Sequence, residues 1–386
     1  MNMRYRLILW NLPSGLLALL ITAALAADDG KDVDWQKAKA LYQRGQAGQT
    51  LSPEEQAYLD RAKKLRAAPN SGRVPAVSGQ KPAPAGTQTT KSPEKPNATV
   101  RGVHYGPHEL QVIDLWKAES RERTPLVVFI HGGGFRAGDT TKIHPSLIVG
   151  CLQAGISVAS IGYRLSPEVH FPDHFMDCAR AIQFLRAHSA DYNIDPKRIA
   201  GSGSSAGAGT ALWLGMHDDF ADPKNADPIL RESTRLNCVA VLQAQTSYDL
   251  RSIREWIGAR TAEHPDAIGF FGLPPGELDT PRAHQVFEQA SPINLLTRDD
   301  PPVFLIYAGT KTKVIAADAK PGEGIHHAIF GVKLKEKMDA LGMECVLKTQ
   351  EDYPDADTMA QTVAGYRDLV GFLRDHLGAK STKNER

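Results

Sequence analysis

Cysteine is scarce in this chain of 386 residues, and its four cysteines have no metal-ligand spacing such as C-x-x-C. We therefore expect no metal site and take buried free thiols as the default, with one or two disulfides left open if the compartment is oxidising. An excess of one charge is also lacking, because the formal net charge is +1. Without a basic patch or a high pI, the sequence predicts no nucleic-acid partner. The cysteines are Cys151, Cys178, Cys238 and Cys345.

The chain also lacks an apolar run long enough for a typical transmembrane helix. Near its start, Arg4 and Arg6 precede an apolar stretch that is broken at residues 11–14 and ends on Ala24-Leu25-Ala26, a pattern typical of a signal-peptide cleavage site. We expect residues 1–26 to be a signal peptide, which makes the mature protein periplasmic or extracellular without stable membrane insertion. An uncleaved anchor that starts at Leu7 is the alternative.

The region after the signal peptide divides into two parts of different composition. Residues 27–67 predict a small helical hairpin, with helices over Trp35–Gln46 and Pro53–Ala67. Ser52 and Glu55 form a capping box around Pro53, which suits a first helical position. Residues 68–98 are rich in Pro, Ala, Gly, Ser, Thr and Lys without an apolar period, so we expect a disordered linker there.

From residue 99 to about residue 379, short β-rich runs alternate with helical patterns, which predicts an α/β domain with a mostly parallel eight-stranded sheet and helices on both faces. A helix is expected between the fourth and fifth strands, and two more over residues 330–341 and 359–377. Residues 251–300 contain no strand pattern and are a candidate lid insertion. The eight expected strands are Thr99–Tyr105, Leu110–Trp116, Leu126–Ile130, Ser157–Ile161, Arg198–Ala200, Val239–Gln243, Val303–Tyr307 and Glu344–Lys348.

A nucleophile motif follows the fifth expected strand. Gly203-Ser204-Ser205-Ala206-Gly207 matches G-x-S-x-G and precedes a helical run, which is the strand–turn–helix setting of a nucleophile elbow. Glycines on both sides allow a turn that would be too tight for side chains. We expect Ser205 to be the nucleophile and the amide of Ala206 to be an oxyanion donor, close to the positive end of the following helix.

A second motif, His131-Gly132-Gly133-Gly134-Phe135, follows the third expected strand. Its glycines let the backbone approach a tetrahedral intermediate, so the amides of Gly133 and Gly134 are the other expected oxyanion donors. We expect His131 to hold this loop rather than act as a base. The glycines near residue 205 also resemble a dinucleotide-binding loop, but such loops normally follow the first strand and need an acidic residue about 20 positions later, which is absent. No cofactor is expected.

With these two motifs, the chain resembles the hormone-sensitive-lipase-like and feruloyl/acetylxylan-esterase-like branch of the α/β hydrolases over residues 100–378. The resemblance implies the α/β-hydrolase fold and cofactor-free hydrolysis of small esters, often acyl groups on polysaccharides. Three further stretches match the family's segments around strands four, five and seven, namely Tyr163-Arg164-Leu165-Ser166-Pro167, Tyr192-Asn193-Ile194-Asp195-Pro196-Lys197-Arg198-Ile199 and Ala290-Ser291-Pro292.

The chain departs from this family at the acid and the base. The family's G-T-x-D turn after strand seven ends here in Thr312, and residues 351–357 after strand eight contain no histidine. A serine needs a base, so we expect His326 or His327, in the loop after strand seven, to supply it, with a weak preference for His327. Asp249, Asp318 and Asp352 are the acids left open. The alternative is that this histidine pair only caps the next helix and packs the loop.

The sequence therefore predicts an exported serine hydrolase, a carboxylesterase that cleaves small acyl esters through a Ser205 acyl-enzyme. Its expected partner is a small-molecule or polysaccharide ester. A catalytically impaired relative that binds a carbohydrate or an acylated ligand is the main alternative, since the acid and base positions are not matched. A peptidase of the same fold is the weakest hypothesis, because no additional domain for peptides is evident.

Overall fold

The computed structural model describes residues 51–67, 92–354 and 358–379, and single helical positions at residues 37, 38, 41 and 44. The expected signal peptide, most of the first hairpin helix and residues 68–91 of the expected linker lie outside the described residues. The chain separates into two compact units, Met1–Gly86 and Thr87–Arg386, each of which is described by itself.

In the first unit, helix α2 spans Pro53–Ala67, the bounds that the sequence predicts. Its capping box is formed as expected: Ser52 Oγ accepts from the Glu55 amide at 3.2 Å, and the Glu55 carboxylate accepts from the Ser52 amide at 2.9 Å. Ala38 packs with Ala62, which brings a described position of the expected first helix against α2.

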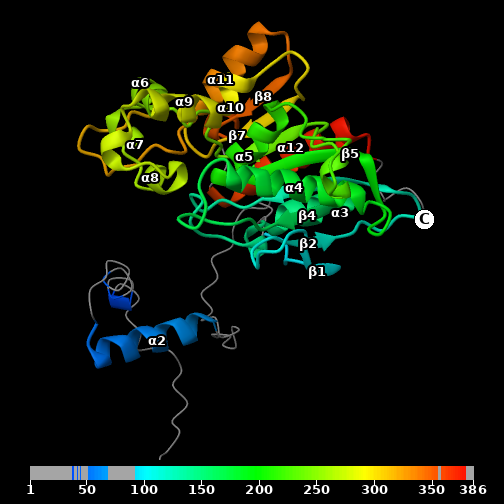
Figure 1. Ribbon diagram of the computed structural model, residues 1–386, viewed down its shortest axis with the longest axis horizontal. Helices are drawn as coiled ribbons and strands as arrows, with labels where there is room; N and C mark the ends of the chain where they lie inside the picture. The colour runs from blue at the N-terminus through cyan, green and yellow to red at the C-terminus, as the bar shows by residue number, and fades with distance from the viewer. Residues whose placement is uncertain are drawn as a thin grey trace, which may run out of the picture. The chain divides into compact units, whose positions relative to one another are not determined.

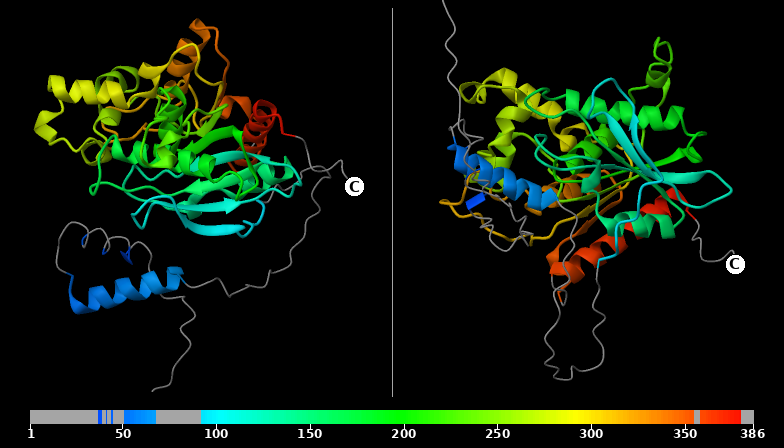
Figure 2. Two further views of the ribbon diagram at one scale, coloured as in Figure 1. Left: turned by 45° about the vertical axis from the view of Figure 1, so that its right-hand side comes forward. Right: turned by 90° about the horizontal axis from the view of Figure 1, so that it is seen from below.

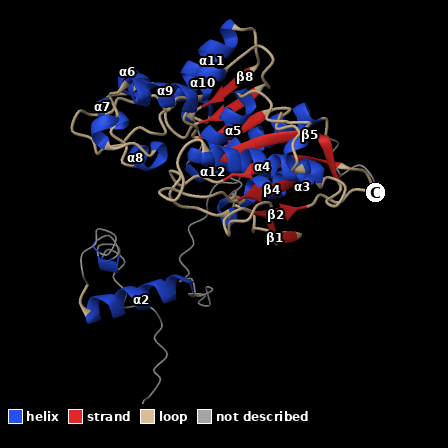
Figure 3. Cartoon of the chain, viewed as in Figure 1, coloured by secondary structure: helices blue, strands red, loops and turns tan. Residues whose placement is uncertain are grey.

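The second unit is built on one eight-stranded sheet in the order β1-β2-β4-β3-β5-β6-β7-β8 (Figure 3). β1 and β2 are antiparallel, and β3 to β8 run parallel to one another. All eight expected strands are therefore confirmed, with β5 much longer than expected. The strands are β1 Val100–His104, β2 Val112–Trp116, β3 Thr124–Ile130, β4 Ser157–Ile161, β5 Ile194–Ser204, β6 Val239–Leu242, β7 Val303–Ile306 and β8 Cys345–Lys348.

Helices cover both faces of this sheet, as the sequence predicts (Figures 1 and 2). Helices α3 (Pro145–Gln153) and α12 (Thr358–Leu377) pack on one face over Val127, Phe129 and Phe304. Helices α4 (Asp173–Ala187), α5 (Ala206–Met216) and α11 (Ile329–Ala340) pack on the other face in a larger core. Short 3-10 turns lie at Thr140–Lys142, Pro228–Arg231, Pro275–Glu277 and Gln350–Asp352.

Between β6 and β7 the chain forms five short helices and no strand, as expected for residues 251–300. In Figures 1 and 2 the first four, in yellow-green and yellow, gather at one side of this unit. They are α6 Leu250–Trp256, α7 Ala259–Ala262, α8 Asp266–Phe271, α9 Pro281–Ala290 and α10 Pro292–Leu295.

Two further expectations concern cysteines and the linker. All four cysteines, each within the described residues, are buried and free, so the default of free thiols is confirmed. Residues 92–98, the end of the expected linker, have no regular secondary structure but contact the domain: the Trp116 indole donates to the Pro96 carbonyl at 2.9 Å, and Lys95 donates to the Thr141 carbonyl at 2.7 Å. This stretch is therefore part of the domain, where the indole of Trp116 binds it. Within the described ranges, no helix has the length and apolarity needed to cross a membrane.

Candidate active site

Ser205 lies at the turn between β5 and α5, in the left-handed region with φ of +52°. The turn requires its two glycines. A Cβ at Gly203 would lie 2.6 Å from the backbone of Gly207, and a Cβ at Gly207 would lie 2.1 Å from the Ile130 carbonyl oxygen. The turn is therefore a nucleophile elbow of the kind that the G-x-S-x-G pattern predicts.

The glycine loop after β3 lies directly beside this elbow. A Cβ at Gly132 would lie 2.6 Å from the Ser204 carbonyl oxygen, and Gly133 and Gly134 have φ of +118° and +62°, which favour glycine. The amides of Gly133, Gly134 and Ala206 line the same cavity as Ser205 and donate no hydrogen bond within the described part of the chain. Free amides around a serine are the arrangement of an oxyanion hole.

His131 has the structural role that we expect for it. Its ring stacks on Tyr163 with centroids 4.3 Å apart, its Nδ1 lies 2.8 Å from the Gly132 carbonyl oxygen, and the Tyr163 hydroxyl donates to the His131 carbonyl at 2.9 Å. Burial lowers the pKa of His131, so the imidazole stays neutral beside the loop. These contacts fix the first residue of the loop and keep its ring away from Ser205.

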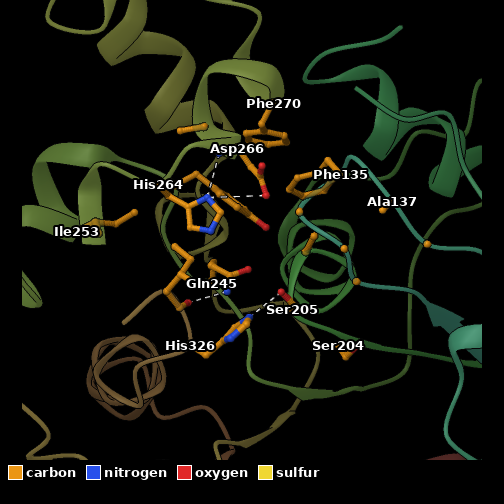
Figure 4. Close-up of a pocket in the computed structure, with 18 of the residues that line it drawn as sticks. Phe135, Ala137, Ser204, Ser205, Gln245, Ile253, His264, Asp266, Phe270 and His326 are labelled. Carbon is orange, nitrogen blue, oxygen red and sulfur yellow. Dashed lines mark hydrogen bonds and ion pairs between the residues drawn. The ribbon is translucent and has the colours of Figure 1, made fainter. Parts of the chain in front are cut away.

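His326 is the histidine that meets the nucleophile. Its Nε2 lies 2.7 Å from Ser205 Oγ, at the end of the long loop between β7 and α11 (Figure 4). The ring is open to the cavity, yet enough protein surrounds it to lower the pKa of His326, mainly through burial and secondly through the charge of His264. Gln245 holds the loop in place, because its side-chain amide donates to the Ile325 carbonyl at 2.8 Å.

The weak preference for His327 is corrected by its contacts. Its Nε2 donates to the Lys313 carbonyl at 2.6 Å, and its Nδ1 accepts from the Ile329 amide at 2.9 Å at the start of α11. Both ring nitrogens are therefore used within the loop, and the ring points away from Ser205. Neighbouring loop residues face opposite ways here, so His327 anchors the segment that presents His326.

None of the three candidate acids contacts His326. Asp249 caps α6 and pairs with Arg251 at 2.5 Å; burial favours a higher pKa, but the Arg251 hydrogen bonds outweigh it and lower the pKa of Asp249. Asp352 accepts from the Thr349 amide at 2.8 Å, and Asp318 is exposed. Among the described residues, no carboxylate lies within hydrogen-bond distance of His326 Nδ1. Within the described part of the chain, Ser205 and His326 therefore form a pair without a third member.

A second histidine faces this cavity from the segment before α8 (Figure 4). His264 Nδ1 accepts from the Asp266 amide at 3.1 Å, which leaves the proton of the neutral ring on Nε2. Burial lowers the pKa of His264, while the Asp266 carboxylate 3.9 Å away opposes that effect. His264 thus offers a hydrogen-bond donor to whatever occupies the cavity.

Helix α8 is fastened over the cavity at both ends. At its start, Asp266 accepts from Arg136 at 2.8 Å and packs so closely on Gly134 that a Cβ there would lie 2.2 Å from Asp266 Oδ2. At its end, the Gly269 carbonyl accepts from Ser166 Oγ at 2.9 Å and lies 2.7 Å from His170 Nδ1. The candidate lid is therefore closed onto the oxyanion loop and onto the loop after β4.

The cavity itself has a volume of about 570 Å³ and a mostly apolar lining. His326 and Gln245 are the polar side chains near Ser205, whereas His264 and Asp266 lie farther along the cavity, near Phe270 (Figure 4). The apolar wall, to which α8 itself contributes, comprises Phe135, Tyr248, Leu250, Ile253, Phe270 and Phe271. A mostly apolar cavity that contains a serine suits an ester with an apolar acyl group.

The sequence pattern identifies some of these residues and misses others. His264, Asp266 and Gln245 carry no motif, since they lie in or before the short helices that the sequence marks only as an insertion. Only their position could point to them, because an insertion between two parallel strands lies near the strand ends where Ser205 is found.

Comparison with known proteins places this site in a family. The BD-FAE family model matches residues 113–320, more than half of the chain. Esterase LipC of Mycobacterium tuberculosis is 27% identical over 56% of this chain and 52% of its own length, so the match spans about half of that relative. The probable carboxylic ester hydrolase LipM of the same organism is 25% identical over 80% of this chain and 72% of its own.

Solved structures agree with the fold. A truncated carbohydrate esterase from gut microbiota has a TM-score of 0.58 at 19% identity, covering 75% of this chain and all of that one. An acetyl ester-xyloside bifunctional hydrolase from Caldicellulosiruptor lactoaceticus has a TM-score of 0.52 at 21% identity, covering 68% of this chain and 88% of its own. With its elbow, its glycine loop and this family match, the chain belongs to the BD-FAE family of α/β-hydrolase-fold esterases.

Proposed function

We propose that this protein is an exported carboxylesterase in which Ser205 is the nucleophile and His326 is the general base. The observation that carries the proposal is the 2.7 Å contact between Ser205 Oγ and His326 Nε2, beside three free amides. A serine hydroxyl is a weak nucleophile until a neighbouring base accepts its proton, and an imidazole at this distance can do so.

In the proposed mechanism, His326 accepts the Ser205 proton as Oγ attacks the ester carbonyl carbon. The amides of Gly133, Gly134 and Ala206 hold the oxyanion, and each such donor contributes about 3 kcal/mol to transition-state stabilisation. His326 then donates its proton to the departing alcohol oxygen, which leaves an acyl group on Ser205. Water, deprotonated by His326, attacks the acyl carbon; the bond to Ser205 Oγ breaks, His326 returns its proton to Oγ, and the carboxylic acid is released.

Orientation of His326 replaces the usual carboxylate in this proposal. The residues on either side of its ring are fixed, because Gln245 binds the Ile325 carbonyl and His327 binds the Lys313 carbonyl. A base held by its backbone needs no hydrogen bond at Nδ1 to point at Ser205. The protonated ring gains no carboxylate partner among the described residues, so we expect slower turnover than a full triad gives.

The substrate class is a small ester with an apolar acyl group. The apolar wall around Phe135 and Phe270 suits the acyl group, and the His264 donor suits a polar alcohol such as a sugar. The names of the structural neighbours, a carbohydrate esterase and an acetyl ester-xyloside hydrolase, support acylated carbohydrates as the substrates to try first.

The base is tested with a matched pair of neighbours, His326→Ala and His327→Ala, on an aryl acetate. We expect His326→Ala to lose at least about a hundredfold in kcat, and external imidazole to restore part of it, because a small base can enter the vacated space. His327→Ala should lose less and should not respond to imidazole, since that side chain only holds the loop. Equal activity of both variants and the parent would exclude His326 as the base.

A non-catalytic binding role is the competing function, and the observation that favours it is that no described residue binds His326 Nδ1. Labelling with a fluorophosphonate probe separates the two functions. The parent should be labelled and Ser205→Ala should not. If the probe does not label the parent and the parent shows no Ser205-dependent hydrolysis of any short ester, the protein is a binding protein and not an esterase.

A further inference from the structure

A second cavity lies behind the apolar wall of the catalytic cavity. Its volume is about 450 Å³, and its walls come from α4, α5, α9 and the chain around α8, with Trp213, Val286 and Leu295 among its apolar residues. Within the described part of the chain, the linings of the two cavities share a single residue, Phe271. Phe271 is therefore the described residue that the two cavities have in common.

Phe271 is held firmly in that position. It is the last residue of α8, is 6% exposed, and lies between Phe270 and Phe287 with ring centroids 4.8 and 4.6 Å away. The next residue, Gly272, is left-handed, and a Cβ there would lie 2.6 Å from the His170 ring. These close contacts hold the end of α8 and its phenyl ring, which we call the partition because it lines both cavities.

The chemistry of the ester decides which part of the substrate meets this partition. His326 must give its proton to the departing alcohol, so the alcohol lies on the His326 side of the cavity. The acyl group then extends the other way, toward Phe135 and Phe270, whose rings stack with centroids 4.3 Å apart. Figure 4 shows these two rings on the opposite side of the cavity from His326. An acyl chain that grows past them reaches Phe271.

We infer that Phe271 is the specificity-determining residue that limits acyl length and confines the protein to short acyl esters. The inference rests on the proposed esterase function and adds its substrate limit. Beyond the ring, the second cavity offers apolar walls that a longer chain would fill. The partition, rather than a lack of space in the fold, excludes long acyl groups.

The test compares 4-nitrophenyl acetate with the octanoate in the parent, Phe271→Leu and Phe271→Ala. The parent should strongly prefer acetate. We expect Phe271→Ala to raise kcat/KM for octanoate relative to acetate by at least about tenfold, the effect of burying two methylene groups, with Phe271→Leu in between. Thermal unfolding of each variant shows whether it is folded. If Phe271→Ala does not fold, Phe271→Leu alone is compared with the parent.

A second substitution checks that the added chain enters the second cavity. Val286 lines that cavity and not the catalytic one. Val286→Phe alone should leave acetate hydrolysis unchanged, whereas Val286→Phe added to Phe271→Ala should return the octanoate preference to the parent value. A parent that already cleaves octanoate as well as acetate, or a folded Phe271→Ala variant with the parent's profile, would overturn the inference.

Equilibrium binding separates this inference from the esterase function. In a Ser205→Ala background, calorimetry with sodium octanoate should show at least about tenfold tighter binding when Phe271 is also Ala. If octanoate binds more tightly to the double variant but the parent hydrolyses no ester, Phe271 limits acyl length in a protein that is not an esterase. Hydrolysis of acetate with equal octanoate binding in both proteins would retain the esterase and refute the partition.

Discussion

In the proposed mechanism the imidazole of His326 must be neutral to accept the Ser205 proton, so its pKa would set the lower pH limit of the reaction. Burial first, and then repulsion from His264 when that ring is protonated, lower the pKa of His326 below the ordinary value of 6.5. A depressed pKa means that the ring loses its proton at a lower pH than a free histidine does. In the proposed reaction, more of the imidazole is therefore neutral at mildly acidic pH, but it is a weaker base than a free histidine.

We expect kcat/KM for an aryl acetate to rise with pH along a limb whose midpoint lies below 6.5, and to be level by neutral pH. His264→Gln removes the second charge, so the midpoint should move upward, toward 6.5. The measurement is a pH profile of both proteins at constant ionic strength. A midpoint that is the same in both proteins would show that His264 does not act on His326 through its charge.

At this scale the sequence locates the tight turn at Ser205 and the glycine loop beside it, because glycine spacing indicates where backbone approaches backbone. It does not choose between His326 and His327, because a loop has no periodicity that says which side chain faces inward. Lys313 and Gln245, which make that choice, lie at distant sequence positions and are fixed only by tertiary contacts. Thr312 stands where the family carries an aspartate, which agrees with the lack of a carboxylate beside His326 among the described residues.

Helix α5 depends on a contact that its own sequence does not reveal. Gly207 sits in its first turn, where a Cβ would lie 2.1 Å from the Ile130 carbonyl oxygen at the end of β3. Because the obstacle is backbone, it has little freedom to move aside. The join between β3, β5 and α5 is therefore as tight as the chain permits.

Gly207→Ala should therefore destabilise the protein by about 1–3 kcal/mol and lower its esterase activity, since β3 leads directly into the oxyanion loop. Gly371 in α12 is the matched control, because a Cβ there meets nothing within 4 Å. Gly371→Ala should stabilise by about 0.5–1 kcal/mol, the usual gain in a helix interior. Denaturant unfolding of both variants measures this contrast, and similar changes of the same sign would contradict it.

Among the elements, all eight strands are predictable because apolar β-branched runs bounded by turns are a strong signal. The extension of β5 back to Ile194 is not, because Asp195, Pro196 and Lys197 do not resemble a strand; Thr124 of β3 pairs with Ile194 to create it. The bounds of α6 to α10 are also out of reach, since helices of four to ten residues are stabilised by packing more than by their own propensity.

On the scale of the whole molecule, the residues that line the catalytic cavity run from Gly132 to His326 and all belong to the second compact unit. We expect a chain that starts at Thr87 to hydrolyse an aryl acetate with the same kcat/KM as one that starts at Ala27. A large loss in the shorter chain, despite unchanged thermal unfolding of its domain, would assign the first unit a part in catalysis.

Export is the other prediction that concerns the whole chain. The apolar segment and Ala24-Leu25-Ala26 predict removal of residues 1–26, so the mature protein should begin at Ala27 and be recovered outside the cytoplasm. N-terminal sequencing after expression in a bacterium with a secretion pathway measures this directly. Exported protein that still begins at Met1 would show that the segment is not cleaved.

Because contacts hold α8 at both ends, opening the cavity to substrate and deforming the oxyanion loop are linked changes. Arg136, which holds the start of the helix, lies two residues from Gly134, and Asp266 rests on Gly134 itself. Lifting the cover to admit an ester must therefore loosen the loop that later receives negative charge. A molecule that fills the oxyanion hole would in turn favour the closed cover, so departure of a bound intermediate should be slower than the size of the opening suggests.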